Sequence, residues 1–359
     1  MRNKEIELKF GLEGPVNNLF EIFSNIGTVS NPKVQHLDNT YFDTDTKDLF
    51  NIRAGLRIRH ADDFSEQTLK VKGENIGGLH RRSEYNLPIE KDVTIPQLQK
   101  FPKEAFPENF DVDDIQERLS SVCRINFTRQ LFTLELLDSE FEVAHDSGFI
   151  SVEGHESYPI NELEIELKKT QVENEDLLNL FSILCNNLAT NDLPLLLEPF
   201  SKMHRASLLK KNSSRVLDLS SFETKGTTVD YVKNLVISFE QLYGYFVVNK
   251  ESTTFSLFTC ALKDLIEALK LLRRRNLPAF IKGQNEPVEY QGDLKIIIRL
   301  LKTFYKACAR NQKKLFKAQI RGYVQEIDSI FKAIRLVEQN TKMFLIPLKL
   351  RLLLSLLAN

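Results

Sequence analysis

Short runs of alternating polar and apolar residues dominate the first half of the chain. The clearest are EIELKF, GLRIRH, QTLKVKG, SEYNLPIE, LFTLELL, EFEVAH and NELEIELK. A period of two is typical of strands that bury one face. Residues that favour hairpin turns separate the runs, namely Gly73, Gly77, Gly78, Asp62, Asp63 and the stretch 146–148. We therefore expect an antiparallel sheet over about residues 4–167.

Two segments within this part have apolar residues at helical spacing instead. They cover residues 15–26, with Leu19 and Phe23 on one face, and residues 173–188, with Leu177 and Phe181 on one face. We expect both helices to pack their apolar faces on the sheet.

The pattern changes after residue 206. A polar passage at 207–224 predicts a linker. Helical periodicity follows at 229–250, 254–275, 290–312, 314–340 and 343–357, with Asp230 and Ser252 or Thr253 as first caps. These patterns predict a strand-rich domain at 1–206, a linker at 207–224 and a helical domain at 225–359.

One face of each predicted strand carries ionised residues. Any single face of this kind is explained by a sheet whose polar side meets water. The glutamates at 162, 164 and 166, however, place like charges about 7 Å apart on one strand with no lysine between them. We therefore expect a cationic partner on that face.

A barrel with these charged faces turned inward would gather acidic and basic strands in one interior. Its apolar outer face would then be covered by the amphipathic helices. Lysine and arginine bind phosphate oxygens, and carboxylates bind hard divalent cations. The predicted fold is α+β, a closed antiparallel β-barrel forming a tunnel with flanking helices, followed by an all-α helical bundle. Its interior would suit a complex of a metal ion with a polyphosphate.

The composition excludes several classes of protein. At 359 residues, 42% hydrophobic and 27% charged, the chain is unlike collagen, a coiled coil or a disordered protein. It opens on charged residues, and the apolar stretch at 344–357 is interrupted by Pro347, Lys349 and Arg351. We therefore expect a cytoplasmic protein with no membrane partner.

The net charge of -1 conceals two unlike halves. Residues 225–359 contain 23 Lys+Arg and 11 Asp+Glu, a net charge of +12, which leaves -13 for residues 1–224. A basic region attracts polyanions, whereas an acidic one attracts metal ions. The two halves are therefore expected to have different partners.

Motifs for other chemistries are missing. The four cysteines lie far apart without CxxC spacing, which predicts buried free thiols, and the six histidines show no HxxxH or HExxH spacing. Neither GxGxxG nor GxxxxGK[ST] occurs. The sequence therefore predicts neither a zinc ribbon, nor a dinucleotide site, nor a P-loop.

The motifs EIELK, NTYFDT, GLRIR, LKVKG, RRSEYN, ELEIELK and SKMHR follow one another in a recognisable order. In this order the chain resembles the CYTH, or triphosphate tunnel metalloenzyme, superfamily over about residues 3–206. The passage GGLHRRSEYN is most similar to the bacterial inorganic triphosphatase branch, in which a helical CHAD domain follows.

The resemblance implies a set of site residues. It assigns a divalent metal, Mg2+ or Mn2+, to Glu5, Glu7, Glu162, Glu164 and Glu166. It assigns the phosphates to Lys9, Arg57, Arg59, Lys70, Arg82, Arg129, Lys202 and Arg205, and Lys72 faces the same way by strand parity. Asp43 and Asp146 also fall on family positions, with a structural role in turns as the alternative.

The implied reaction is metal-dependent hydrolysis of inorganic triphosphate to diphosphate and phosphate. The group that takes the proton of water stays open among Glu166, Lys70 and Glu84. The alternatives are an organic triphosphate such as thiamine triphosphate or a nucleotide, cyclisation of ATP as in class IV adenylyl cyclases, and polyphosphate binding without catalysis. The absence of tryptophan disfavours an organic substrate.

The helical half resembles a CHAD domain by position, helicity and charge, although it lacks the histidines for which those domains are named. Basic residues recur at helical spacing at Lys302, Lys306, Arg310, Lys313, Lys314, Lys317 and Arg321. On one helix face they would form a stripe suited to polyphosphate, with a solvated surface as the alternative. Nucleic acid is disfavoured because no reading motif is present.

Overall fold

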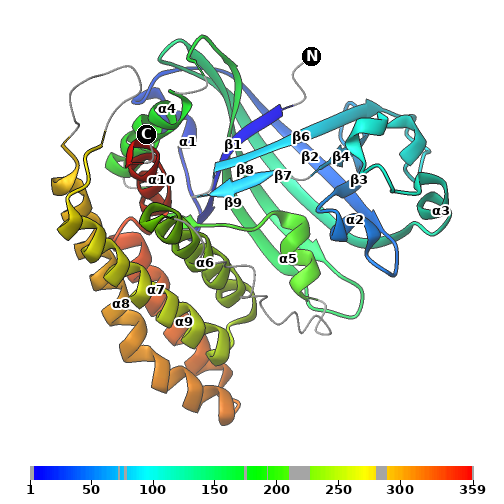
Figure 1. Ribbon diagram of the computed structural model, residues 1–359. Helices are drawn as coiled ribbons and strands as arrows, with labels where there is room; N and C mark the ends of the chain where they lie inside the picture. The colour runs from blue at the N-terminus through cyan, green and yellow to red at the C-terminus, as the bar shows by residue number, and fades with distance from the viewer. Residues whose placement is uncertain are drawn as a thin grey trace.

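The computed structural model describes residues 4–71, 73–76, 79–173, 176–191, 193–209, 227–279 and 289–357. A twisted β-barrel forms one side of the molecule, and a group of long helices packs against it (Figure 1). The order of elements is therefore strands first and helices second, as the sequence predicts.

Eight strands close the barrel. They are hydrogen-bonded in the order β1, β9, β8, β7, β2, β3, β4, β6, and β6 pairs back to β1. Their bounds are Lys4–Leu12 for β1, Thr28–Asp43 for β2, Gly55–His60 for β3, Ser65–Lys70 for β4, Leu79–Pro88 for β6, Ser120–Leu136 for β7, Ser139–Ser151 for β8 and Tyr158–Thr170 for β9. All of these pairings are antiparallel. The predicted closed antiparallel barrel is confirmed.

Strand β1 closes the barrel because both of its edges are used. One edge pairs with β9 over residues 7–11, and the other pairs with β6 over residues 4–8. Beyond the end of β6, the short strand β10 (Leu195–Leu197) pairs with residues 10–12 of β1. A further short strand, β5 (Glu74–Ile76), pairs with β6. Three elements that are distant in sequence therefore meet along a single strand.

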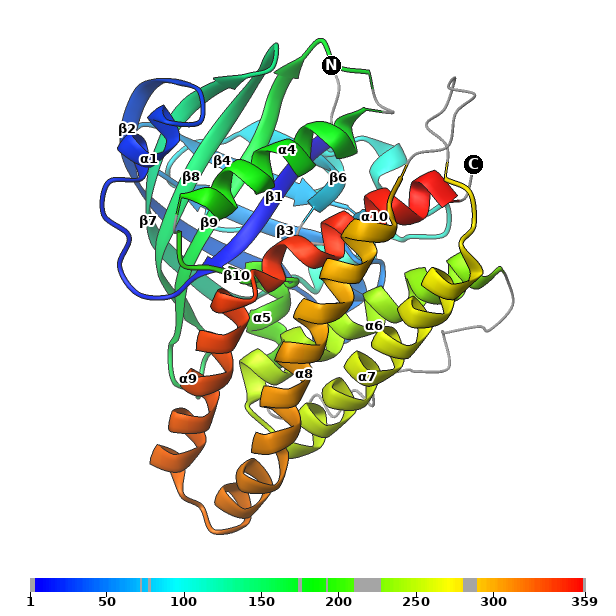
Figure 2. The same ribbon diagram turned by 90° about the vertical axis from the view of Figure 1, so that its left-hand side faces the viewer.

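Strand alternation gives the barrel an apolar outer face. Leu163 and Ile165 of β9 are fully buried in a cluster with Phe181 of helix α4 (Leu177–Thr190), which lies across the outside of the strands (Figure 2). Helix α1 (Leu19–Ser24) adds Phe23 to the same cluster. It is shorter than the predicted helix at 15–26 because Asn18, the residue before it, has a left-handed backbone with φ 68°.

The turn predicted at 146–148 is wrong. These residues lie inside the long strand β8, and its hairpin with β7 is made instead by Leu137 and Asp138, with φ of 49° and 53°. Two consecutive residues with positive φ are typical of a tight hairpin turn. Gly148 is needed for close approach of strands, because a Cβ there would overlap the carbonyl oxygen of Asn126 on β7. By contrast, Asp62 and Asp63 lie between β3 and β4, as predicted.

Short helices complete the barrel part. Helices α2 (Asp48–Asn51) and α3 (Val112–Glu117) and the 3-10 turns η1 (Leu98–Lys100) and η2 (Lys103–Ala105) surround an apolar cluster beside β3 and β4. Helix α5 (Lys202–Leu209) places Met203 and Ala206 against Ile125 and Ile150 of β7 and β8. These two strand residues share parity with Arg129 and Asp146, so α5 packs on the inner face of the barrel.

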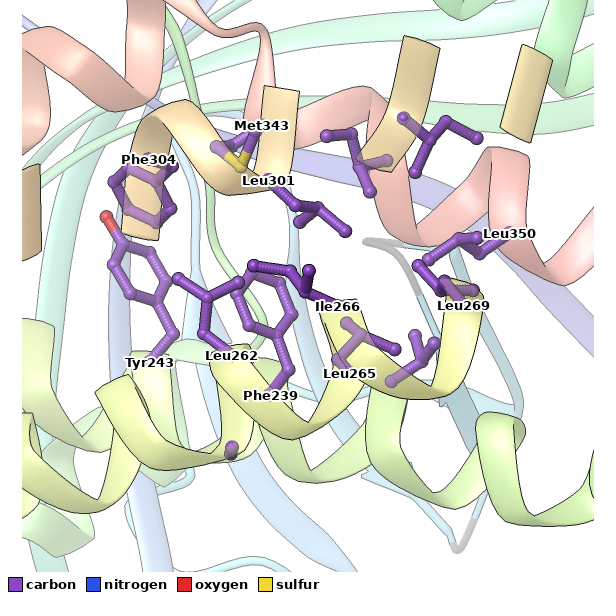
Figure 3. Packing of buried hydrophobic residues seen from close by; sticks show 14 of the residues in the cluster. Phe239, Tyr243, Leu262, Leu265, Ile266, Leu269, Leu301, Phe304, Met343 and Leu350 are labelled. Atoms are coloured by element: carbon purple, nitrogen blue, oxygen red, sulfur yellow. The ribbon is translucent and has the colours of Figure 1, made fainter. Parts of the chain in front are cut away.

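The second half forms long antiparallel helices. Their bounds are Thr228–Asn249 for α6, Ser252–Arg275 for α7, Gln291–Ile320 for α8, Val324–Asn340 for α9 and Ile346–Leu357 for α10, with the 3-10 turn η4 (Met343–Leu345) before α10. Their shared core is apolar, with Phe239, Leu262 and Leu301 from three helices meeting in it (Figure 3). The predicted helical bundle is confirmed.

Several helix ends differ from the prediction. Helix α7 follows Glu251, so Ser252 and Thr253 lie inside the helix and are not its cap. The break between α8 and α9 falls at 321–323, not at 313, because Gly322 (φ 69°) ends α8 while Tyr323 N–H bonds to Ala318 O at 2.9 Å and Gly322 N–H to Gln319 O at 3.1 Å. Helix α6 is capped by Thr227, and Asp230 completes a capping box as its third residue. Asp230 is therefore a partner of the cap.

The two halves share packing. Phe344 of η4 meets the ring of Phe10 on β1 at 5.3 Å between centroids, and Leu348 of α10 joins the cluster outside the barrel. In return, Leu197 of β10 is part of the helical core. None of the four cysteines, all of which the structure describes, forms a disulfide, and Cys260 is exposed where a buried thiol was predicted. Over the described residues, none of the helices has the length and hydropathy to cross a membrane.

Candidate active site inside the barrel

Charged side chains from seven strands and from helix α5 share the barrel interior. Strand alternation directs Glu5, Glu7 and Lys9 of β1 inward, opposite Leu8 and Phe10, and all three are at most 7% exposed. The same parity turns inward the charged residues of β3, β4, β6, β7, β8 and β9. Isolated charges are rarely buried without partners, so the contacts among these residues decide what the site can bind.

The first group of contacts joins β1, β4 and β6. Lys70 Nζ donates to Glu5 Oε1 at 2.8 Å and lies 3.0 Å from Glu84 Oε2, and Arg82 Nε donates to Glu5 Oε2 at 2.9 Å. These cations hold the pKa of Glu5 well below its usual range although burial acts to raise it. Glu5 is therefore an ionised carboxylate with two cationic neighbours.

The second group joins β7, β8, β9 and α5. Asp146, Glu162 and Glu164, here called the carboxylate group, have oxygens that lie within 4.8 Å of one another. Lys202 Nζ donates to Asp146 at 2.6 Å and to Glu164 at 2.8 Å, and also contacts Glu162. One ammonium therefore neutralises the centre of three carboxylates, which is a position that suits a cation.

Arg129 and Arg205 bound the carboxylate group on two sides. Arg129 donates to both oxygens of Asp146 at 2.7 Å and to Glu164 at 2.5 Å, and Arg205 donates to Glu162 at 2.5 Å. Burial acts to raise the pKa values of Glu164 and Asp146. Lys202 and Arg129 nevertheless keep the pKa of Glu164 well below its usual range and also lower the pKa of Asp146.

Glu7 is the carboxylate with the weakest cationic support among these described residues. Within the described part of the chain it accepts a hydrogen bond from Arg82 Nη2 at 3.2 Å. Burial, Glu5 and Glu164 together raise the pKa of Glu7 to about 8. Glu7 therefore carries a proton near neutral pH, and a further cation nearby would favour its ionised form.

Three neighbouring arginines lie among the acids of the barrel interior. Arg57, Arg59 and Arg129, here called the arginine group, have side chains that are 9%, 11% and 14% exposed. Burial, Arg57 and Arg129 lower the pKa of Arg59 to about 10. Arg57 lies 3.6 Å from Glu84 and 3.8 Å from Glu66, and its buried Nε has no hydrogen-bond acceptor among the described residues. A buried guanidinium donor without an acceptor favours an anionic ligand.

The four remaining predicted residues have different outcomes. Glu166 shares the inward face of β9, yet 26% of its side chain is exposed and it pairs with Lys168 at 2.7 Å. Lys72 lies outside the described residues. Asp43 accepts backbone N–H groups of Thr44, Leu49 and Phe50, which gives it the structural role in a turn. Asp146, in contrast, is fully buried in the carboxylate group.

Sequence reasoning missed some interior partners. Glu66 lies 3.5 Å from Arg59, and Glu198, next to β10, lies 3.3 Å from Arg205. Glu66 shares parity with Thr68 and Lys70 on one strand, so alternation would have revealed it. Glu198 follows a three-residue strand of leucines and carries no periodic signal.

A closed barrel with paired acids and bases in its interior defines a charged tunnel. The chain belongs to the family described as CYTH domain, whose model matches residues 3–189. That match ends before the helical half, so the resemblance of residues 225–359 to a CHAD domain stays a prediction.

Known relatives are similar over the barrel part. An inorganic triphosphatase of Haemophilus influenzae is 35% identical over 173 residues, which cover 47% of this chain and 47% of the relative. The chain thus matches about half the length of that relative. A Hippeastrum protein, described as a candidate adenylyl cyclase with a dominant triphosphatase activity, is 21% identical with a TM-score of 0.41 and covers 56% of this chain and 95% of its own. A Pyrococcus horikoshii protein is 20% identical with a TM-score of 0.35, covering 58% and 99%.

Proposed function

We propose that this protein hydrolyses inorganic triphosphate to diphosphate and phosphate inside the barrel, in a reaction that depends on Mg2+ or Mn2+. The observation that carries the proposal is the arginine group beside the carboxylate group, with the buried Nε of Arg57 lacking an acceptor among the residues that the structure describes. The named activity of the Haemophilus influenzae relative supports the choice of inorganic triphosphate.

The carboxylate group fits a hard divalent cation. Its donors are carboxylate oxygens within 4.8 Å of one another, which Mg2+ and Mn2+ prefer, and it already surrounds the ammonium of Lys202. Glu5 and Glu7 would add ligands from the adjacent strand. When bound, such an ion supplies Lewis-acid polarisation of the phosphate chain.

The basic residues would bind and orient the substrate. Arg57, Arg59 and Arg129 present planar guanidinium groups that match phosphate oxygens, and Lys9 and Lys70 act as point charges. A triphosphate would exchange the long contacts of Arg57 with Glu84 and Glu66 for direct charge-assisted hydrogen bonds. Stabilising charge that develops on the transferred phosphoryl group is the main source of catalysis in such reactions.

Glu166 is the best placed of the three candidates for accepting the proton of water. Burial raises its pKa, while Lys168 acts to lower it, and its side chain still reaches solvent. Glu5 and Glu84 raise the pKa of Lys70 against the effect of burial, which keeps Lys70 protonated. A charged ammonium cannot act as a base, so Lys70 would instead hold phosphate. Glu84 forms an ion pair with this ammonium at 3.0 Å.

Phosphate release by the purified full chain tests the proposal. We expect release from inorganic triphosphate with Mg2+ or Mn2+, little from ATP, thiamine triphosphate or long polyphosphate, and none with a chelator. Replacing Glu166→Gln is expected to lower kcat with little change in KM. Phosphate release from an organic triphosphate alone would contradict inorganic triphosphate as the substrate. Binding of triphosphate without phosphate release would indicate a binding protein instead of an enzyme.

We also propose that the basic stripe along α8 and its C-cap Arg321, the seven residues from Lys302 to Arg321 named above, binds long polyphosphate. The supporting observation is that all seven are exposed. The double variant Lys313→Gln, Lys317→Gln should weaken polyphosphate binding and reduce its dependence on salt. Binding equal to that of the parent at every salt concentration would contradict this role.

A further inference from the structure

Residues 197–200 form a short segment between the barrel and the helices. Leu197 ends β10, which pairs with β1, and Phe200 lies two residues before α5. Figures 1 and 2 show this connection passing beside α6 and α9. The segment therefore contacts both halves of the molecule.

On the barrel side, the segment holds two residues of the proposed triphosphate site. Lys9 Nζ donates to the carbonyl oxygen of Phe200. Glu198 lies 3.3 Å from Arg205, which in turn donates to Glu162 of the carboxylate group at 2.5 Å. A displacement of residues 198–200 would therefore move the partners of Lys9 and Arg205.

On the helical side, a buried polar trio holds the start of the segment. Glu338 of α9 is fully buried, and its Oε1 accepts the N–H of Leu197 at 2.7 Å. Its Oε2 accepts the hydroxyl of Tyr243 of α6 and Arg335 Nη1 at 3.2 Å. This trio fixes Leu197 by a charge-assisted hydrogen bond away from water.

Arg335 of the trio also has an electrostatic interaction with Glu198 of the segment. Arg335 lies near Gly11 of β1, where an added Cβ would be 3.7 Å from Arg335 Nη2 and 3.9 Å from Glu198 Cβ. Tyr243, Glu338 and Glu198 raise the pKa of Arg335 although burial acts to lower it. The positive charge of Arg335 therefore faces the same Glu198 that supports Arg205.

Helix α6 supports the other end of the segment through a glycine. A Cβ at Gly244 would lie 2.7 Å from the ring of Phe200 and 2.7 Å from Pro199 Cγ. The ring of Phe200 also packs edge-on against Tyr245 of α6 at 5.2 Å between centroids. Only a residue without a side chain allows this approach, so α6 sets the position of Pro199 and Phe200.

We propose that the helical half is a positioning element of the barrel site: Gly244, Arg335 and Glu338 hold residues 197–200 so that Lys9 and Arg205 are placed for an anionic phosphate chain. The identity of the ligand, a phosphate chain, rests on the proposed function. The role of the helical half in placing residues 197–200 does not depend on it. None of the three residues would touch the substrate. Glu338 acts through Leu197, Arg335 through Glu198, and Gly244 through Pro199 and Phe200.

The principal test compares Gly244→Ala with Gly292→Ala in the purified full chain. Both replace a helical glycine, and a Cβ at Gly292 meets no described residue within 4 Å. For Gly244→Ala we expect roughly tenfold weaker binding of inorganic triphosphate in calorimetry with Mg2+, an increase in KM larger than the change in kcat, and faster amide hydrogen exchange in residues 197–205. For Gly292→Ala we expect the values of the parent.

A second set of variants removes the charge of Glu338 instead of adding a side chain. Glu338→Gln keeps an acceptor for the N–H of Leu197, Glu338→Ala removes it, and Glu326→Gln is the control on the exposed start of α9. We expect the Ala variant to show the larger loss of triphosphate affinity and the faster exchange at 197–205, the Gln variant a smaller one, and the control none. If Gly244→Ala gives no cooperative thermal transition, Glu338→Gln decides with the same readouts.

The readouts separate the two proposals. If the parent binds triphosphate without releasing phosphate, the proposed function fails, and affinity and exchange still test the positioning role. Exchange at residues 197–205 equal to that of the parent in both Gly244→Ala and Glu338→Gln would overturn the positioning role whatever the catalytic result. Faster exchange with unchanged KM and affinity would overturn the link between the segment and the site.

Discussion

The barrel interior and the core of the helical half are built on opposite principles. The barrel interior buries carboxylates against lysines and arginines, among them Glu5, Glu162 and Arg205, each at most 7% exposed. In the described part of the helical half, the buried charged residues are Glu240, Arg335 and Glu338, within a core of leucine, isoleucine and phenylalanine.

This difference shows where stability and chemistry come from. Burial of apolar area stabilises the helical half and the outer surface of the barrel. Buried ion pairs add little net stability because desolvation offsets their attraction, and they leave charges ready for a ligand. Substitutions in the two regions should therefore have different readouts: unfolding free energy in the helical core, and metal, proton and phosphate binding in the barrel.

The largest expected effect on stability is in the helical core. Phe258 of α7 is fully buried, with the rings of Tyr243 and Phe239 at 5.2 and 5.5 Å. Phe258→Ala should lower the free energy of unfolding in urea by about 4 kcal/mol, because it leaves a cavity. Phe316→Ala, at a side chain that is 55% exposed, should change it by about 0.5 kcal/mol or less. Equal losses in the two variants would contradict the assignment of the core.

The second effect lies in the barrel and depends on pH. Without metal, the pKa of Glu7 is raised from 4.5 to about 8. Below pH 4.5 the carboxyl is protonated in both states; above it only the unfolded state ionises, so the stability of the fold declines as pH rises toward 8. Glu7→Gln removes this loss.

With a chelator present, Glu7→Gln should match the parent near pH 4.5 and exceed its unfolding free energy by about 3 kcal/mol at pH 7. Urea unfolding at the two pH values measures the difference. The matched control is Glu135→Gln, at an exposed residue near the end of β7, which should show no such dependence. A difference between Glu7→Gln and parent that does not grow with pH would refute the raised pKa.

The third effect concerns catalysis alone. Glu164→Gln removes one charge from the carboxylate group and should reduce triphosphate hydrolysis roughly 100-fold, equal to about 2.7 kcal/mol of transition-state stabilisation. Initial rates at saturating triphosphate and Mg2+ measure this loss. Glu135→Gln again serves as the control, and hydrolysis at the parental rate in Glu164→Gln would remove the carboxylate group from the site.

The smallest effect is local to the start of α6. Thr227 accepts the N–H of Asp230, and the side chain of Asp230 accepts the N–H of Thr227 at 3.0 Å. Thr227→Ala should lower the unfolding free energy by about 1 kcal/mol and leave triphosphate hydrolysis unchanged. Thr227→Ser, which keeps the hydroxyl, should restore most of it, and a lowered hydrolysis rate in Thr227→Ala would show that the regions are less separate than their cores indicate.

The sequence by itself determined the faces of the strands and the type of most elements. The alternation at 162–166 separates Glu162, Glu164 and Glu166 from Leu163 and Ile165, because side chains on a strand point to opposite faces by local geometry. Helical spacing likewise predicted α4 and the long helices of the second half. Gly322, which ends α8, was a further local signal in the sequence, and the predicted boundary at 313 did not take it into account.

Only the tertiary structure decided which charges meet. Asp146 was predicted with a turn role as an alternative, yet it joins Glu162 because β8 pairs with β9. Lys202 and Arg205 reach the carboxylate group because α5 packs on the inner face of the barrel, and Leu197 reaches Glu338 across 141 positions of sequence. Local periodicity fixes which way a side chain faces on its own strand or helix, whereas the partner it meets depends on long-range pairing and on the burial of apolar surface between distant elements.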